Sequence, residues 1–258
     1  MAIATKRSVG SNLLGRNLLA SNLLGSRSLG LVLISLCAAG AASYGLARAD
    51  EAPRALPKAS VDAPAAGGGF ETAVLAGGCF WGQQGVFEHV KGVRRVVAGY
   101  SGGEKSTATY EQVSTETTGH AESIEITFDP KQVTYGQILQ VFFSVAHDPT
   151  ELDRQGPDTG PSYRSEIFFT NASQERVARA YVAQLDAAHA FGKPIVTKIE
   201  PLKGFYAAEA YHQDYLIHNP GAYYIVVNDL PKIANLKRIY PELYNETAAA
   251  LPAKESSL

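Results

Sequence analysis

The chain has 258 residues, of which 45% are hydrophobic, and a formal charge of −2 at neutral pH. This length suits one globular domain of about 150–200 residues with additional segments at its ends. The near-balanced charge gives no electrostatic basis for a nucleic-acid partner. Two cysteines are too few for a disulfide framework or a cysteine-cluster zinc site.

Residues 1–49 differ in composition from the rest. They contain no Asp or Glu, and basic residues precede an apolar run at 29–43. Ala47-Arg48-Ala49 then fits the small-x-small pattern of a signal-peptidase site, so we expect an export signal. The protein would be periplasmic, or membrane-anchored facing the periplasm if the segment is retained. An organelle transit peptide shares this Arg-rich, Ser-rich and acid-free composition. Cys37 lies in the apolar run, which would leave Cys79 as the only thiol of the mature protein.

Composition also suggests the limits of the folded part. Residues 50–69 are rich in Ala, Pro and Gly, which predicts a flexible linker. Residues 246–258 read as an unstructured tail. One domain is therefore expected over 70–245.

Hydrophobic periodicity predicts the elements in chain order. Strands are expected at 72–76, 93–100, 122–130, 164–170 and 195–202. Helices are expected around Phe80–Val90, from a capping box at Thr134 and Gln137 to about Ala146, at about 173–190, at 207–219 and after Pro231. The order β-α-β-β-α-β over 72–170 predicts an α+β fold. It is the ferredoxin-like split βαβ two-layer sandwich, with helices on one face of an antiparallel or mixed sheet and a long C-terminal extension.

Cys79 lies in "GGCFWG" (77–82), between a predicted strand and a predicted helix. The N–H groups and positive dipole of a helix N-terminus would stabilise a thiolate and lower the pKa of the thiol. The alternative is a small buried hydrophobic residue, as most free cysteines are. Phe80 and Trp81 follow, and two aromatic rings beside a thiol can form an apolar slot for a methyl-thioether group.

Three further residues could act beside this thiol. Glu122 begins a strand, where burial would keep its carboxyl group protonated and able to donate a proton; a solvated glutamate is the alternative. Tyr110 and Tyr163 each come from a loop ahead of a strand, and packing would also explain them. His212 has Leu216 rather than a ligand at i+4, so no metal site is expected.

Taken together, these motifs resemble those of the A-type peptide methionine sulfoxide reductases. The resemblance rests on "GGCFWG" (77–82), "GYSGG" (99–103), "TGHAE" (118–122), "FDP" (128–130), "HDPT" (147–150), "YRSEIF" (163–168) and "YHQDYL" (211–216), which fall in family order. It covers about residues 72–225.

The resemblance implies a role for each matched residue. Cys79 would attack the sulfoxide sulfur, and Glu122, Tyr110 and Tyr163 would hydrogen-bond and protonate the sulfoxide oxygen. Phe80 and Trp81 would hold the ε-methyl group, and Asp158 would support the site. The substrate would be the S epimer of methionine sulfoxide, free or in a protein, and the product would leave Cys79 as a sulfenic acid.

The chain departs from many family members in lacking a second cysteine near its C-terminus. We therefore expect an external thiol to regenerate Cys79: a thioredoxin-like protein, a glutaredoxin or glutathione. No bound cofactor and no metal are expected, and the protein would be a monomer. Two other functions fit a lone cysteine: a Cys–His acyl hydrolase that uses His120 or His212 as base, and a non-catalytic redox-sensing module.

Overall fold

A computed structural model describes residues 53–63 and 68–251 of the chain. The segment expected to be an export signal lies outside these residues. The described strands are β1 (Glu71–Gly77), β2 (Val93–Ser101), β3 (Ala121–Phe128), β4 (Arg154–Gln155), β5 (Asp158–Thr159), β6 (Ser165–Phe169), β7 (Lys198–Pro201) and β8 (Phe205–Ala207). The α-helices are α2 (Phe80–Glu88), α3 (Tyr110–Val113), α4 (Tyr135–Val141), α5 (Ala172–Ala187), α6 (Tyr215–His218) and α7 (Leu230–Ile239). Short 3-10 turns are η1 (Lys105–Thr107), η3 (Pro161–Tyr163) and η4 (Ala210–His212), and π-helical turns are η2 (Phe142–Ala146) and η5 (Ile225–Asp229).

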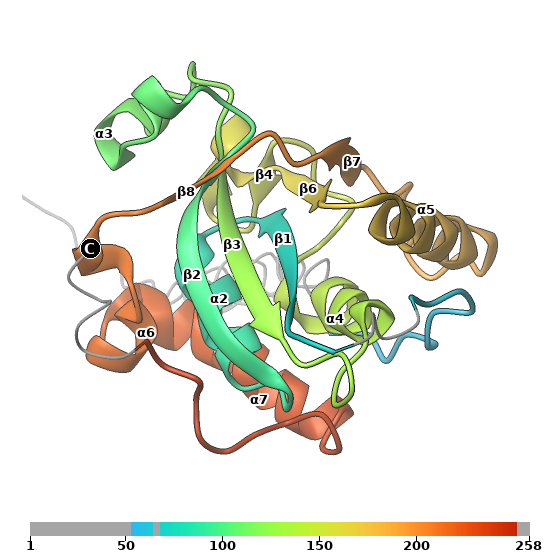
Figure 1. Cartoon of the computed structure of the whole chain (residues 1–258). Coiled ribbons are helices and arrows are strands. Elements are labelled where there is room, and N and C mark those ends of the chain that lie inside the picture. The colour runs from blue at the N-terminus through green and yellow to red at the C-terminus, as the bar shows by residue number, and fades with distance from the viewer. Residues whose placement is uncertain (1–52, 64–67, 252–258) are drawn as a thin grey trace, which may run out of the picture. The chain divides into compact units, whose positions relative to one another are not determined.

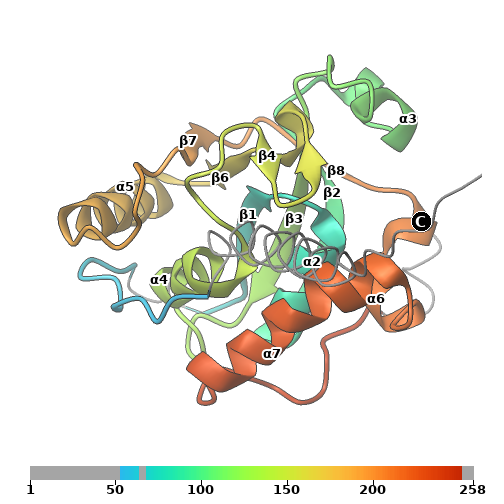
Figure 2. The same cartoon turned by 180° about the vertical axis from the view of Figure 1, so that it is seen from behind.

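Six strands form one sheet in the order β7-β6-β1-β3-β2-β8, and β4 pairs with β5 separately. The four central strands are antiparallel, whereas β7 runs parallel to β6. With α2 and α4 on one face, this is the split βαβ arrangement expected from the sequence (Figures 1 and 2). The predicted α+β fold is confirmed, and β7, β8, α6 and α7 form its C-terminal extension.

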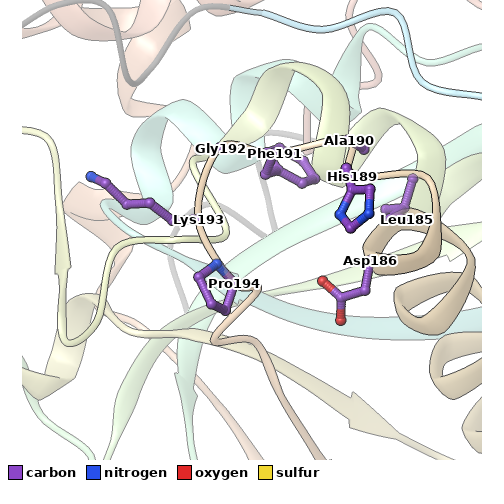
Figure 3. Close-up of a pocket in the computed structure, with 8 residues that line it drawn as sticks. All are labelled: Leu185, Asp186, His189, Ala190, Phe191, Gly192, Lys193 and Pro194. Atoms are coloured by element: carbon purple, nitrogen blue, oxygen red, sulfur yellow. The ribbon is translucent and has the colours of Figure 1, made fainter.

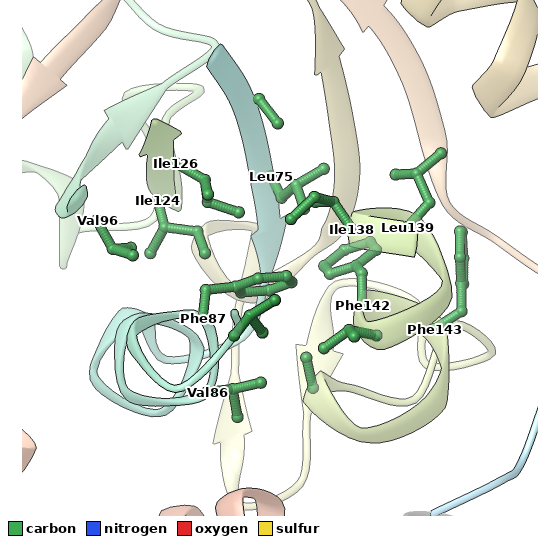
Figure 4. Close-up of a cluster of buried hydrophobic side chains, with 14 of the residues drawn as sticks. Leu75, Val86, Phe87, Val96, Ile124, Ile126, Ile138, Leu139, Phe142 and Phe143 are labelled. Atoms are coloured by element: carbon green, nitrogen blue, oxygen red, sulfur yellow. The ribbon is translucent and has the colours of Figure 1, made fainter. Parts of the chain in front are cut away.

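The main core lies between the sheet and these helices (Figure 4). Successive side chains of β1 point to opposite faces of the sheet. Leu75 therefore points into this core, while Val74 and Ala76 belong to a small cluster on the other face. Phe87 of α2 and Phe142 of η2 close the core from the helix side, and both side chains are fully buried. This packing fixes α2, whose first residue follows Cys79, against the sheet.

Residues 53–63 are not the flexible linker that composition predicts over 50–69. Leu56 is 7% exposed; its N–H donates to the Tyr240 hydroxyl at 2.9 Å and its carbonyl accepts from Gln140 at 2.7 Å. Asp62 accepts hydrogen bonds at the N-terminus of α4, from the N–H of Gly136 at 2.9 Å and the hydroxyl of Thr134 at 2.5 Å. An Ala/Pro-rich segment can be ordered when packed helix ends supply its hydrogen-bond partners.

The tail also differs from expectation up to residue 251. Leu251 is buried, its N–H donates to Asp214 at 3.1 Å, and the N–H of Ala249 donates to the carbonyl of Glu88 at 2.8 Å. These bonds attach Ala249 to the C-terminal end of α2 and Leu251 to the residue that precedes α6. In the described part of the chain, no helix is both long and apolar enough to cross a membrane.

The predicted helix at 207–219 is wrong. The segment forms β8, η4 and the short α6 instead, and Asp214 interrupts it with a left-handed φ of 50°. Gln213 and Asp214 make hydrogen bonds that a continuous helix would exclude. The side-chain amide of Gln213 accepts the backbone N–H of Ala98 at 3.0 Å and donates to the Ala98 carbonyl at 2.9 Å. The N–H of Asp214 donates to the side chain of Gln84 at 2.9 Å. Buried polar contacts to β2 and α2 override the helical periodicity.

Candidate active site

Cys79 occupies the turn between β1 and α2, as its sequence position predicts. Gly78 has a φ of +91°, and a Cβ atom there would come within 2.5 Å of the buried Gln155 side chain, so only glycine fits. Cys79 is the N-cap of α2 and is 8% exposed. The thiol therefore lies at a helix N-terminus but under other side chains.

The structure contradicts the expectation of a lowered thiol pKa. Burial raises the pKa of Cys79 well above its ordinary value, and the nearby carboxyl groups of Glu122, Asp229 and Asp158 raise it further. The backbone N–H of Trp81 lowers the pKa, but this one donor does not compensate for burial and negative neighbours. A helix terminus lowers a thiol pKa only where desolvation is small.

Glu122 lies next to Cys79. Its Oε2 accepts the backbone N–H of Phe80 at 3.0 Å, and the residue is 4% exposed. Burial raises the pKa of Glu122 to about 8, and the charges of Asp158, Glu116 and Asp229 add to the rise, while the Phe80 N–H opposes it. Burial at this position thus favours the protonated carboxyl group that the sequence analysis expects near neutral pH.

The two predicted tyrosines come from separate turns and meet at this thiol and carboxyl group. Tyr110 begins α3, where its N–H donates to Glu209 at 2.9 Å, and Tyr163 ends η3. Burial raises the pKa of each hydroxyl, and negative charge on Glu122 and Cys79 raises both further. Both phenols are thus neutral hydrogen-bond donors beside the thiol and Glu122.

The two aromatic residues after Cys79 differ in exposure. Trp81 is partly exposed and stacks on Tyr215 with ring centroids 3.9 Å apart, while its Nε1–H donates to His212 at 3.1 Å. Phe80 is only 1% exposed and packs against Tyr100 and His212. Trp81 therefore supplies a partly exposed wall near the thiol, whereas Phe80 is part of the main core.

Asp158 lies in β5 and accepts a hydrogen bond from the Tyr224 hydroxyl. The rings of Tyr224 and Trp81 meet edge to face, with centroids 5.9 Å apart. Burial raises the pKa of the Tyr224 hydroxyl and negative charge on Cys79 raises it further, so Tyr224 belongs to the same site. The sequence analysis did not identify Tyr224 or Tyr215. Tyr215 lies in the predicted helix at 207–219 and Tyr224 lies beyond it, and no local pattern indicates that either ring packs on Trp81.

Asp229 is a third residue that the sequence analysis did not identify. It is fully buried at the end of η5, and a Cβ atom on Gly82 would come within 2.1 Å of its Oδ1. Glycine at position 82 thus lets a carboxyl group approach the first turn of α2. Lys232 lies 3.7 Å from the same oxygen.

The histidines proposed as bases for acyl hydrolysis have other partners. His120 lies between the N–H of Gly103 at 3.3 Å and the carbonyl of Glu104 at 3.0 Å, and His212 accepts from Trp81. Neither is among the groups that shift the pKa of Cys79. This geometry gives the acyl-hydrolase hypothesis no support.

A separate pocket lies at the C-terminal end of α5 and is lined by residues from Leu185 to Pro194 (Figure 3). None of the residues expected to act with Cys79 lines it. Across 53–63 and 68–251, no group of three or more His, Cys, Asp or Glu side chains is arranged to hold a metal ion.

A thiol can take an oxygen atom from a sulfoxide only if a proton reaches that oxygen, and this α+β fold holds a thiol and a proton-bearing carboxyl group together. The protein thus belongs to the class of thiol-dependent oxidoreductases.

Comparisons with known proteins identify the family. The profile of the peptide methionine sulfoxide reductase family matches residues 71–243, so the chain belongs to that family and is an enzyme that reduces methionine sulfoxide. It is 62% identical over 178 residues to peptide methionine sulfoxide reductase MsrA 2 of Mesorhizobium japonicum, covering 69% of this chain and 91% of that protein. The MsrA 2 protein of Synechocystis is 51% identical over 174 residues, covering 67% and 81%.

Solved structures agree with the sequence comparison. Methionine sulfoxide reductase A of Corynebacterium diphtheriae matches with a TM-score of 0.53 and 36% identity, covering 67% of this chain and 85% of that one. Reduced Mxr1 of Saccharomyces cerevisiae matches with a TM-score of 0.54 and 33% identity, covering 60% and 88%.

Proposed function

We propose that Cys79 is the nucleophile and Glu122 the proton donor in the reduction of the S epimer of methionine sulfoxide, free or in a protein. The single observation that carries the proposal is the position of Glu122, which bonds to the residue after Cys79 and keeps its proton up to about pH 8. A carboxyl group of ordinary pKa would be ionised and could not protonate the sulfoxide.

In the proposed reaction, the Cys79 sulfur forms a bond to the sulfoxide sulfur while the sulfoxide oxygen takes the Glu122 proton. The protonated oxygen then transfers from the substrate sulfur to the Cys79 sulfur: the bond between the two sulfur atoms breaks with its electron pair left on the substrate, and Cys79 becomes a sulfenic acid. The substrate sulfur gains two electrons and leaves as a thioether, and Cys79 loses two. Tyr110 and Tyr163 donate hydrogen bonds to the oxygen as it becomes negative.

The protons shared by Cys79 and Glu122 predict how the rate depends on pH. The reactive pair, thiolate with protonated Glu122, has one proton in total, as does a thiol beside ionised Glu122. Because Glu122 loses its proton near pH 8 and Cys79 only at higher pH, kcat/KM should rise toward pH 8 and fall again above the second pKa. The two apparent pKa values belong to the pair.

Substrate selection would come from the aromatic wall. Trp81 presents one ring near the thiol, and Tyr215 and Tyr224 fix that ring by stacking and edge contact. An apolar wall favours the ε-methyl group, since sulfur and methyl groups pack well on aromatic rings. Asp158 would hold the Tyr224 hydroxyl in place. With the oxygen directed to Glu122 and the methyl group to Trp81, only one sulfoxide epimer would fit.

Regeneration would use a thiol from another molecule, because Cys79 is the only cysteine after residue 37. A reductant thiol attacks the sulfenic acid, releases water and leaves a mixed disulfide on Cys79. A second thiol then attacks that disulfide and restores Cys79. Glutathione, a glutaredoxin or a thioredoxin-like protein can each supply both thiols.

The function is tested by incubating the reduced protein, residues 50–258, with a peptide containing each epimer of methionine sulfoxide. Without added thiol we expect one equivalent of thioether from the S epimer only, and one added oxygen atom on Cys79 by mass spectrometry. With glutathione we expect continued turnover and a glutathione adduct on Cys79. Oxidation of Cys79 by peroxide without any thioether would instead indicate a redox-sensing module.

We also propose that residues 1–49 direct export to the periplasm and are then removed, with a retained membrane anchor or an organelle transit peptide as the alternatives. Full-length protein expressed in a bacterium should be recovered from the periplasm with Asp50 as its first residue. Ala49→Leu should block this cleavage while the rest of the chain is unchanged. Intact full-length protein in the cytoplasm would contradict the proposal.

A further inference from the structure

Glu116 lies in the loop after α3, the helix that begins at Tyr110. Its backbone φ is 62°, a left-handed conformation that is uncommon for a residue with a side chain. The loop keeps Glu116 there although glycine would adopt this conformation without strain. A side chain retained in an unfavourable conformation points to a requirement for that side chain.

The Glu116 carboxylate holds the turn that carries Tyr163. Its Oε2 accepts the backbone N–H of Ser162 at 2.9 Å, and its Oε1 accepts the Ser162 hydroxyl at 2.8 Å. Ser162 is 3% exposed and directly precedes Tyr163. Bonds to an ionised acceptor at both oxygens are the stronger kind of hydrogen bond and fix the orientation of the turn.

The same turn is shaped around this carboxylate. Gly160 has a φ of 140°, and a Cβ atom there would come within 2.3 Å of the Glu116 carboxyl carbon. On the other side, Arg164 donates to the carbonyls of Pro161 at 2.8 Å and Gly119 at 3.0 Å. Arg164 therefore joins the turn to the loop leading into Glu122, and Glu116 joins it to the loop leading from Tyr110.

We propose that Glu116 is a positioning residue of the reaction, which joins the turns of Tyr110 and Tyr163 so that both hydroxyl groups meet the sulfoxide oxygen. This inference rests on the roles proposed for the two tyrosines. Glu116 does not touch the substrate, and it acts through the two turns.

The charge of Glu116 has a second effect that gives an independent readout. The charge of Glu116 raises the pKa of Glu122, as do the charges of Asp158 and Asp229. The other titratable groups that face the Glu122 carboxyl group are Cys79, Tyr110 and Tyr163. Removing this charge should move the lower apparent pKa of kcat/KM to more acidic pH. Removing the Ser162 hydroxyl should leave that pKa unchanged, because the charge remains.

The test compares Glu116→Gln, Glu116→Gly and Ser162→Ala with the parent protein and with Glu111→Gln, which removes a charge from an exposed position of α3. We expect kcat to fall about tenfold in both Glu116 variants and about threefold in Ser162→Ala, with KM changed less than about twofold. The lower apparent pKa should fall in the Glu116 variants only. Glu116→Gln should stay near the parent melting temperature, because its amide oxygen can still accept a hydrogen bond from Ser162, whereas in Glu116→Gly the loss of both acceptors opposes the relief of backbone strain.

Parent kcat and pH profile in both Glu116 variants would overturn the inference, as would losses of kcat that follow losses of melting temperature. These outcomes differ from failure of the proposed function, in which the parent and Glu111→Gln would themselves produce no thioether.

Discussion

Replacement of Cys79 by Ser should abolish the reduction of methionine sulfoxide, with a fall in kcat of at least about four orders of magnitude. A serine hydroxyl is a much weaker acid and nucleophile than a thiol, and its oxygen cannot accept the sulfoxide oxygen in the way that sulfur does when it forms a sulfenic acid. The substitution is nearly isosteric at a residue that is 8% exposed, so the fold around β1 and α2 should remain. The measurement is thioether formation from the S epimer with excess glutathione.

The matched control is Cys37→Ser in the full-length chain, which removes the other cysteine from the segment proposed to be cleaved. This variant should keep parent turnover. Loss of turnover in Cys37→Ser with a disulfide partner identified for Cys79 would show that the chain supplies its own second thiol, against the proposed external regeneration.

Local sequence patterns were sufficient to predict the central fold. The alternation in "ESIEITF" and the capping box at Thr134 and Gln137 each depend on neighbours a few residues away, and both are present in the structure. The strand order β6-β1-β3-β2 then follows from the right-handed β-α-β connections of the split βαβ motif.

Patterns failed where a distant partner decides the local structure. Composition indicates a linker at 50–69, yet Tyr240 and Gln140 bind the backbone of Leu56 and order it. Likewise, Gln84 binds Asp214 and ends the helix expected over 207–219. In each case the hydrogen-bond partner is distant in the sequence, so the periodicity of the neighbouring residues carries no information about it.

Motifs identified most of the residues that gather around Cys79, and burial of Glu122 was expected to raise its pKa, but the raised pKa of Cys79 was not expected. Cys79, Glu122, Tyr110 and Tyr163 were identified from motifs, whereas Asp229 was not, because nothing in "VVND" indicates that its carboxyl group packs on the first turn of α2. The expected low thiol pKa was wrong for the same reason. Desolvation and gathered carboxyl groups are properties of the folded chain, and they oppose the helix terminus that the sequence suggests.

Replacement of Glu122 by Gln should lower kcat/KM about a hundredfold to ten-thousandfold, the range that a positioned general acid contributes. The amide can still accept the Phe80 N–H that Oε2 accepts at 3.0 Å, so the start of α2 should keep its geometry. What is lost is the proton that Glu122 holds up to about pH 8. The pH profile should change shape as well as height. One titrating group, Cys79, then remains, so kcat/KM should rise with thiolate formation and no longer fall at high pH.

Glu125→Gln is the matched control, because it changes the same side chain on the same strand, at a residue that lies 4.0 Å from Arg95 and is not among the groups acting on Cys79. It should keep parent rates and the bell-shaped profile. A Glu122→Gln protein that retained kcat/KM within about threefold would move the proton-donor role to Tyr110 or Tyr163. The burial that raises the pKa of Glu122 would then serve only to keep negative charge away from the Cys79 sulfur.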